Sequence, residues 1–132
     1  MLLQTEIARL SWARHHGAEF LYLDFSHASV ESSLALIDEF VRALQDREDR
    51  SVLLLTNVSE AGYDSAIALK WKSARLAQSA KIRASAVFGL SGLVGMAVRG
   101  FMEAAEMLGL HWTDQLKVFK AEEEAKEWLC KQ

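Results

Sequence analysis

The fold is decided by residues 84–102, which read ASAVFGLSGLVGMAVRGFM. This stretch approaches the roughly 20 apolar residues that a membrane-spanning helix needs. The segment Gly89-Leu90-Ser91-Gly92 interrupts it, and glycines beside a serine are typical of a turn. We therefore predict a strand, a turn and then a helix over about Leu93–Leu108, with no membrane span.

Short apolar runs recur on both sides of this stretch, and amphipathic segments follow them. The other runs are FLYLDF at 20–25, VLLL at 52–55 and LKVF at 116–119. Strands that alternate with helices are typical of an α/β layer structure with a mainly parallel sheet. We predict four or five strands, about four helices and a single domain over residues 1–132.

The N-terminal part predicts an antiparallel hairpin at the edge of the sheet. Residues 7–12 alternate, with Leu10 and Trp12 on one face and Arg9 on the other. The segment 15–18 (HHGA) is a turn that leads into the strand at 19–25. An N-terminal helix is the alternative.

Helical periodicity predicts which residues the helices bury. The first helix starts after Ser29, a good N-cap, and its stripe consists of Leu34, Ile37, Val41 and Leu44. A second helix is predicted over 64–80. Its main stripe consists of Ala66, Leu69, Ser73 and Leu76, with Ile67, Trp71 and Ala74 beside it. A fourth helix is expected over 121–131.

Composition excludes several classes of function. The formal net charge is −3, so the whole molecule has no electrostatic attraction for nucleic acid. Cys130 is the only cysteine, which excludes an internal disulfide and a zinc site built from cysteines. Gln4 and Glu6 interrupt the apolar start, so we expect no signal peptide. We predict a cytoplasmic protein.

Three segments resemble parts of a known family. They read LLLTNVSEAGYDSAIAL (53–69), RASAVFGLSGLVGMAVRGF (83–101) and FKAEEEAKEWL (119–129). Together with the order of elements, they resemble the STAS domain of anti-sigma-factor antagonists. More narrowly, the chain is similar to the bacterial SpoIIAA-like group, which is related to lipid-binding Sec14-type domains.

The resemblance implies a phosphate acceptor. In STAS antagonists a partner kinase phosphorylates the serine after an aspartate, and the phosphate controls docking to that partner. By position this serine would be Ser65, preceded by Asp64. A helix N-terminus stabilises added negative charge, which suits this role. The alternative is that Asp64 or Ser65 only caps the helix.

Further anion- or ligand-binding candidates come from the charge pattern. Residues 65–102 contain no acidic side chain, and Lys70 and Arg75 are among their basic residues. Ser91 and Gly92 start the third helix, whose N-terminus can bind an anion. The alternative for the basic segment is a solvated face that acidic residues of a neighbouring helix balance.

The third helix is apolar on nearly all sides, so one sheet cannot cover it. Met96, Phe101 and Met102 are the candidates for a second buried surface. That surface would serve a homodimer, an apolar ligand pocket or an adjacent helix.

The sequence gives little support for a catalytic site or a metal site. Ser91, His27 and Asp24 can be drawn as a hydrolytic triad, but no G-x-S-x-G motif supports it. His15 and His16 have no acidic or cysteine ligand nearby in sequence, so we interpret them as a solvated turn. We expect no catalytic residue, no metal and no cofactor.

Two hypotheses follow. The first is a non-enzymatic regulatory module of the STAS type that acts by binding a protein partner or a second copy. The alternative is a domain that binds a lipid or another apolar ligand in a pocket beside the third helix.

Overall fold

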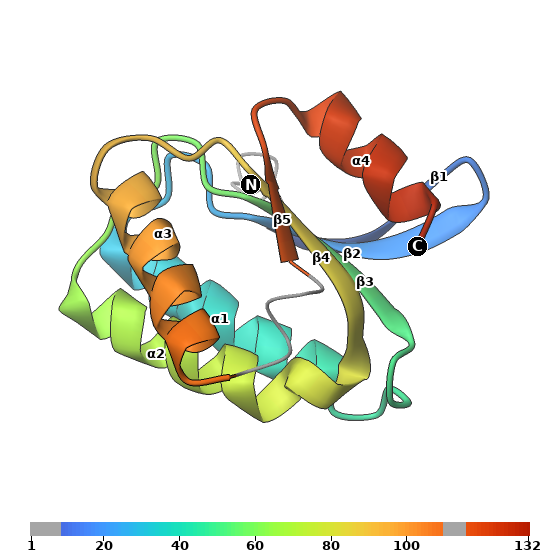
Figure 1. Ribbon diagram of the computed structural model, residues 1–132, viewed down its shortest axis with the longest axis horizontal. Coiled ribbons are helices and arrows are strands. Elements are labelled where there is room, and N and C mark those ends of the chain that lie inside the picture. Colours follow the sequence, from blue (N-terminus) through green and yellow to red (C-terminus); the bar gives the residue numbers. More distant parts are fainter. Residues whose placement is uncertain (1–8, 110–115) are drawn as a thin grey trace, which may run out of the picture.

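The computed structural model describes residues 9–109 and 116–132, which form one five-stranded sheet in the order β1-β2-β3-β4-β5 (Figure 1). The strands are β1 (Leu10–His15), β2 (Ala18–Asp24), β3 (Val52–Asn57), β4 (Ile82–Phe88) and β5 (Leu116–Phe119). The helices are α1 (Val30–Leu44), α2 (Ser65–Gln78), α3 (Gly92–Met107) and α4 (Glu122–Cys130), with a 3₁₀ turn, η2 (Ser79–Lys81), after α2. The pairs from β2 to β5 are parallel, so the predicted fold class is confirmed.

The edge hairpin is confirmed, and the helix alternative is wrong for the described residues. β1 pairs with β2 in antiparallel register from Leu10 opposite Leu23 to His15 opposite Ala18. His16 and Gly17 form the two-residue connection, with φ of 51° and 83°. Positive φ at both central positions is typical of a type I′ turn, whose twist matches that of the strands. Residues 7 and 8 of the predicted strand lie outside the described part.

The sheet separates two apolar cores. Helices α1, α2 and α3 lie on one side of the sheet, and α4 lies on the other (Figure 1). Leu21, Leu23 and Leu54 belong to the core under α1 and α2, whereas Phe20 and Leu55 belong to the core under α4. Strands buried on both faces need apolar residues at successive positions, which explains the continuous apolar runs.

Helix α1 begins where predicted, but its buried face is rotated. Ser29 is the N-cap, and its Oγ accepts a hydrogen bond from the Ser32 amide at 3.1 Å. The buried apolar residues are Leu36, Ile37, Phe40 and Leu44. Leu34 and Val41 of the predicted stripe are half-buried at its border. The helix buries the stripe that holds the larger aromatic residue Phe40.

The main stripe predicted for α2 is wrong. Leu69 is 67% exposed and Leu76 is 40% exposed, so this stripe lies on the surface. The residues predicted beside that stripe face inward instead. The buried residues of the helix are Ile67, Ala74, Arg75 and Gln78. Trp71 sets the rotation, because its ring packs 5.7 Å from that of Phe25 and 5.3 Å from that of Phe40.

The strand–turn–helix prediction for 84–108 is confirmed. β4 ends at Phe88 and α3 begins at Gly92. Between them Gly89 has a φ of 86°, and a Cβ there would lie 2.8 Å from the Ser59 amide nitrogen. Only glycine fits this turn. Among the described helices, none is long and apolar enough to cross a bilayer.

Candidate functional site

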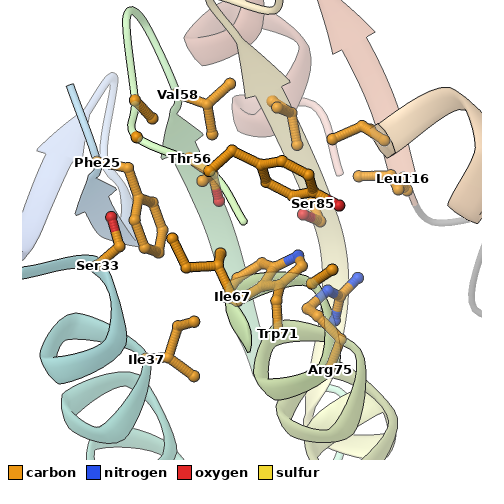
Figure 2. Close-up of a pocket in the computed structure, with 16 residues that line it drawn as sticks. Phe25, Ser33, Ile37, Thr56, Val58, Ile67, Trp71, Arg75, Ser85 and Leu116 are labelled. Carbon is orange, nitrogen blue, oxygen red and sulfur yellow. The ribbon is translucent and has the colours of Figure 1, made fainter. Parts of the chain in front are cut away.

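A pocket of about 140 Å³ lies between the helices on one face of the sheet and the strands beneath them (Figure 2). Most of its wall is apolar, and residues from α1, α2, α3, three strands and two loops contribute to it. The described lining residues are Phe25, Ser33, Ile37, Thr56, Val58, Ala61, Gly62, Tyr63, Ile67, Ala68, Trp71, Arg75, Ser85, Val87, Val98 and Leu116.

The size of the pocket limits its occupant. A cavity of about 150 Å³ lined by apolar side chains accepts benzene in an engineered protein. The pocket here is of similar volume, and Phe25 and Trp71 supply flat aromatic walls. A body of about one benzene ring or a short branched chain therefore fits.

Arg75 is the only charged side chain among the described lining residues. It is 3% exposed, and burial lowers the pKa of its guanidinium to about 10. Figure 2 shows the guanidinium turned from α2 towards the strand that carries Ser85. The charge is thus held in a low dielectric, where its attraction for an anion is much stronger than in water.

Two hydroxyl groups add hydrogen-bonding capacity to the apolar wall. Ser33 and Thr56 are 1% and 2% exposed, and within the described chain neither Oγ of Ser33 nor Oγ1 of Thr56 has a hydrogen-bond partner. A buried hydroxyl without a partner costs about 1–3 kcal/mol. A few polar groups on an apolar wall are typical of sites that orient a small ligand.

Three of the four predicted anion-binding residues can be placed, and they do not gather at one site. Arg75 lines the pocket, but Lys70 forms an ion pair with Asp38 of α1 at 2.9 Å. Ser91 is exposed directly before α3 and is not among the described lining residues, while the surroundings of Gly92 lie outside the described part. For Lys70, the structure agrees with the alternative of a face balanced by an acidic neighbour.

Two of the three apolar residues predicted on α3 also lie apart from the pocket. Met96 is 68% exposed and Met102 is half-buried, and neither is among the described residues that line it. The side chain of Phe101 lies outside the described part. Helix α3 instead reaches the pocket through Val98.

The residues drawn as a hydrolytic triad do not assemble. The Asp24 carboxylate accepts a hydrogen bond from the Ser26 amide at 2.9 Å. His27 is exposed, with a φ of 53°. Over residues 9–109 and 116–132, no hydrogen bond joins the His27 side chain to Asp24 or Ser91.

Sequence reasoning missed the partner of the two adjacent histidines. Nε2 of His15 and Nε2 of His16 lie 2.8 Å and 3.0 Å from the same carboxylate oxygen of Glu127. These contacts hold the pKa of Glu127 below its usual value, the His15 hydrogen bond being the largest cause. Glu127 is 112 residues from His15 in sequence, so a search among near neighbours could not find it.

Comparison with models of known families finds no match, and neither does comparison with curated proteins. A solved structure of an uncharacterised DUF3478-family protein from Shewanella loihica, described as having a SpoIIAA-like fold, is similar to this chain. The two share 18% identity, the superposition covers 92% of each chain, and the TM-score is 0.64. The fold is SpoIIAA-like. The predicted resemblance is therefore confirmed as a resemblance of fold.

Within this SpoIIAA-like fold, Asp64 and Ser65 have different positions at the start of α2. Asp64 is the N-cap, and its Oδ1 accepts a hydrogen bond from the Ile67 amide at 2.9 Å. The capping interpretation of Asp64 is therefore confirmed. Ser65 is the first residue of the helix and its side chain is exposed.

Proposed function

We propose that this protein is a non-enzymatic module that binds a small organic anion with an apolar body. The observation that carries the proposal is the burial of Arg75 in the wall of an otherwise apolar pocket. A guanidinium held in an apolar wall attracts a carboxylate or phosphate more strongly than one in water, because the low dielectric strengthens the interaction. We therefore expect a carboxylate or phosphate group on the ligand.

The two ends of the ligand are matched by different parts of the wall. Guanidinium binds a carboxylate through two parallel N–H···O bonds, which fixes orientation as well as charge. Trp71, Ile37 and Val87 would cover the apolar body. The hydroxyls of Ser33 and Thr56 would donate to polar atoms that the ligand carries. A monocarboxylate with an aromatic or short branched body meets these requirements.

A binding role fits the residues around the pocket better than catalysis does. The described lining residues include no histidine, cysteine or carboxylate that could act as a general base or a strong nucleophile. Arg75 has a pKa far above neutrality even after burial, so it remains a cation. The proposal therefore assigns recognition to the pocket and no proton transfer.

Benzoate and its neutral analogue benzamide test the proposal, because they share shape and differ in charge. We expect benzoate to bind at a single site, measured by calorimetry and by ligand-observed NMR. Benzamide should bind at least about tenfold more weakly, which corresponds to about 1.4 kcal/mol. Arg75→Met should remove this difference between the two probes.

Two further variants separate the charge from the cavity. Lys72→Met removes an exposed charge from the same helix and should leave benzoate binding unchanged. Ala68→Phe fills the pocket and should weaken both probes alike. Equal binding of benzoate and benzamide to the natural protein would contradict the proposal. Mass spectrometry of a native extract that shows a bound long-chain lipid would contradict the small size of the ligand.

A second candidate function is docking of a protein partner in the STAS manner. It is favoured by the surface of α2, where Ser65, Leu69 and Leu76 lie on one exposed face. Phosphate on Ser65 would add charge beside two exposed leucines and change the affinity of that face for a partner.

Incubation with anti-sigma-type kinases, followed by mapping of phosphate, tests this second role. We expect label on Ser65 and its loss in Ser65→Ala. Label on Ser91 instead, or none anywhere, would remove the phosphate switch. The benzoate experiment is unaffected by either result, because Ser65 does not line the pocket among the described residues.

A further inference from the structure

The turn of the edge hairpin and the last helix bring three metal-binding side chains together. His15, His16 and Glu127 each offer a ligand atom, and these atoms lie within 4.8 Å of one another. The cluster is separate from the pocket, because the pocket lies under α1 and α2 whereas α4 covers the opposite face of the sheet. It therefore calls for its own explanation.

Local geometry places both histidines on the same side of the hairpin. Side chains of successive strand residues point to opposite faces of a sheet. His16 leaves the extended conformation with a φ of 51°, so its ring does not follow this alternation. The two ring centroids are 4.2 Å apart, and both Nε2 atoms face the carboxylate of Glu127.

The distances are close to those of a coordinated ion. Zinc lies about 2.0–2.2 Å from histidine nitrogen and carboxylate oxygen, so two tetrahedral ligands are about 3.4 Å apart. The nitrogens are 2.8 Å and 3.0 Å from the Glu127 oxygen, so a small rotation of these side chains would admit an ion. The side chains of His16 and Glu127 are 66% and 48% exposed, so a bound ion would keep a coordination position open to water.

The chemistry of the donors selects the class of ion. Two imidazole nitrogens and one carboxylate suit zinc, nickel, cobalt or copper, whereas magnesium and calcium prefer oxygen ligands alone. We propose that His15, His16 and Glu127 bind one divalent transition-metal ion, with water completing its coordination.

Bound metal would join two parts of the chain that are far apart in sequence. His15 ends β1, while Glu127 lies in α4, and Cys130 already holds this junction through a hydrogen bond from its Sγ to the His15 carbonyl oxygen at 3.0 Å. An ion that binds only the folded state stabilises it, by about a hundredfold in the folding equilibrium at a hundred times its dissociation constant.

Zinc titration of the untagged, chelator-treated full-length protein tests the proposal. We expect saturable binding of one Zn²⁺ per chain by calorimetry and a rise in the unfolding temperature. His16→Ala, His15→Ala and Glu127→Gln should each weaken zinc binding at least tenfold. Mg²⁺ should neither bind nor raise the unfolding temperature. His16 and Glu127 are exposed enough that their variants should fold, which circular dichroism would verify.

Two matched variants exclude other sites. His27→Ala removes an exposed histidine from another loop and should retain zinc affinity within twofold. Cys130→Ser removes the single thiol and should also retain it. The proposal is overturned if no saturable site exists, if His27→Ala weakens binding as much as His16→Ala, or if Cys130→Ser alone abolishes binding.

Discussion

Arg75 occupies a position on α2 where helical periodicity would normally place an apolar residue. It follows Trp71 by four residues and Ile67 by eight, so it shares their inward face. The sequence marks it as one of several basic residues, and only the pocket distinguishes it from Lys70, which pairs with Asp38 at the surface. Burial of a charge at such a position lowers the stability of the folded protein. Residues that serve binding commonly have this cost.

Arg75→Met should therefore leave the stability of the protein without ligand nearly unchanged. The pKa of Arg75 is lowered by desolvation, which means that the folded environment disfavours its charged form. Relief of this desolvation should offset the loss of the contacts that the guanidinium makes, so the free energy of unfolding should stay within about 1 kcal/mol of that of the natural protein. Urea denaturation measures this. A large loss of stability would show that Arg75 is a structural residue.

Gly89→Ala should destabilise the protein through the turn before α3. A side chain at a φ of 86° is strained, and its Cβ would meet the Ser59 amide nitrogen at 2.8 Å. The conformational cost is about 1–2 kcal/mol, and the close contact adds to it. Thermal unfolding measures the loss. Gly100→Ala is the control, since a Cβ there meets nothing within 4 Å, and it should not lower stability.

At the scale of elements, α2 shows why periodicity alone was insufficient. Both of its stripes contain apolar residues at helical spacing, and the sequence does not say which one faces the sheet. Contacts with Phe25 and Phe40 decide it, because they anchor Trp71 on the inner side. The choice leaves Leu69 and Leu76 exposed and places Arg75 in the pocket wall.

Substitutions on the buried face of α2 should change the free energy of unfolding much more than substitutions on its exposed face. Trp71→Ala should lower the free energy of unfolding by about 2–4 kcal/mol, because it removes aromatic packing from the core. Leu69→Gln should change it by less than about 0.5 kcal/mol, since the side chain is mostly in water. Chemical denaturation of both variants measures the difference. Comparable losses would mean that α2 is rotated.

At the scale of the molecule, the sheet separates the candidate pocket from the core beneath α4. The pocket lies under α1 and α2, while Ala125 and Leu129 of α4 pack on the opposite face against Leu55 and Ala86. Among the described residues, the strands of the sheet contribute side chains to both cores and connect them.

Leu129→Ala should therefore lower stability without changing the pocket. Loss of this fully buried leucine should cost about 2–5 kcal/mol. The affinity for benzoate, measured well below the unfolding temperature, should stay within about twofold of the natural protein. Ile37→Ala, from the pocket side, is the matched comparison and should reduce both stability and benzoate binding.

The sequence alone determined the order of strands and helices, the hairpin, the break at Gly89 and the cap at Ser29. These features depend on the alternation of apolar residues, on helical spacing and on turn residues. All three are set by residues within a few positions of one another in the chain. Only the tertiary structure decided which stripe of α2 is buried, why Arg75 differs from Lys70, and that Glu127 meets His15 and His16. Each of these depends on contacts between segments far apart in the chain, and such contacts leave no pattern in the neighbouring residues of a single sequence.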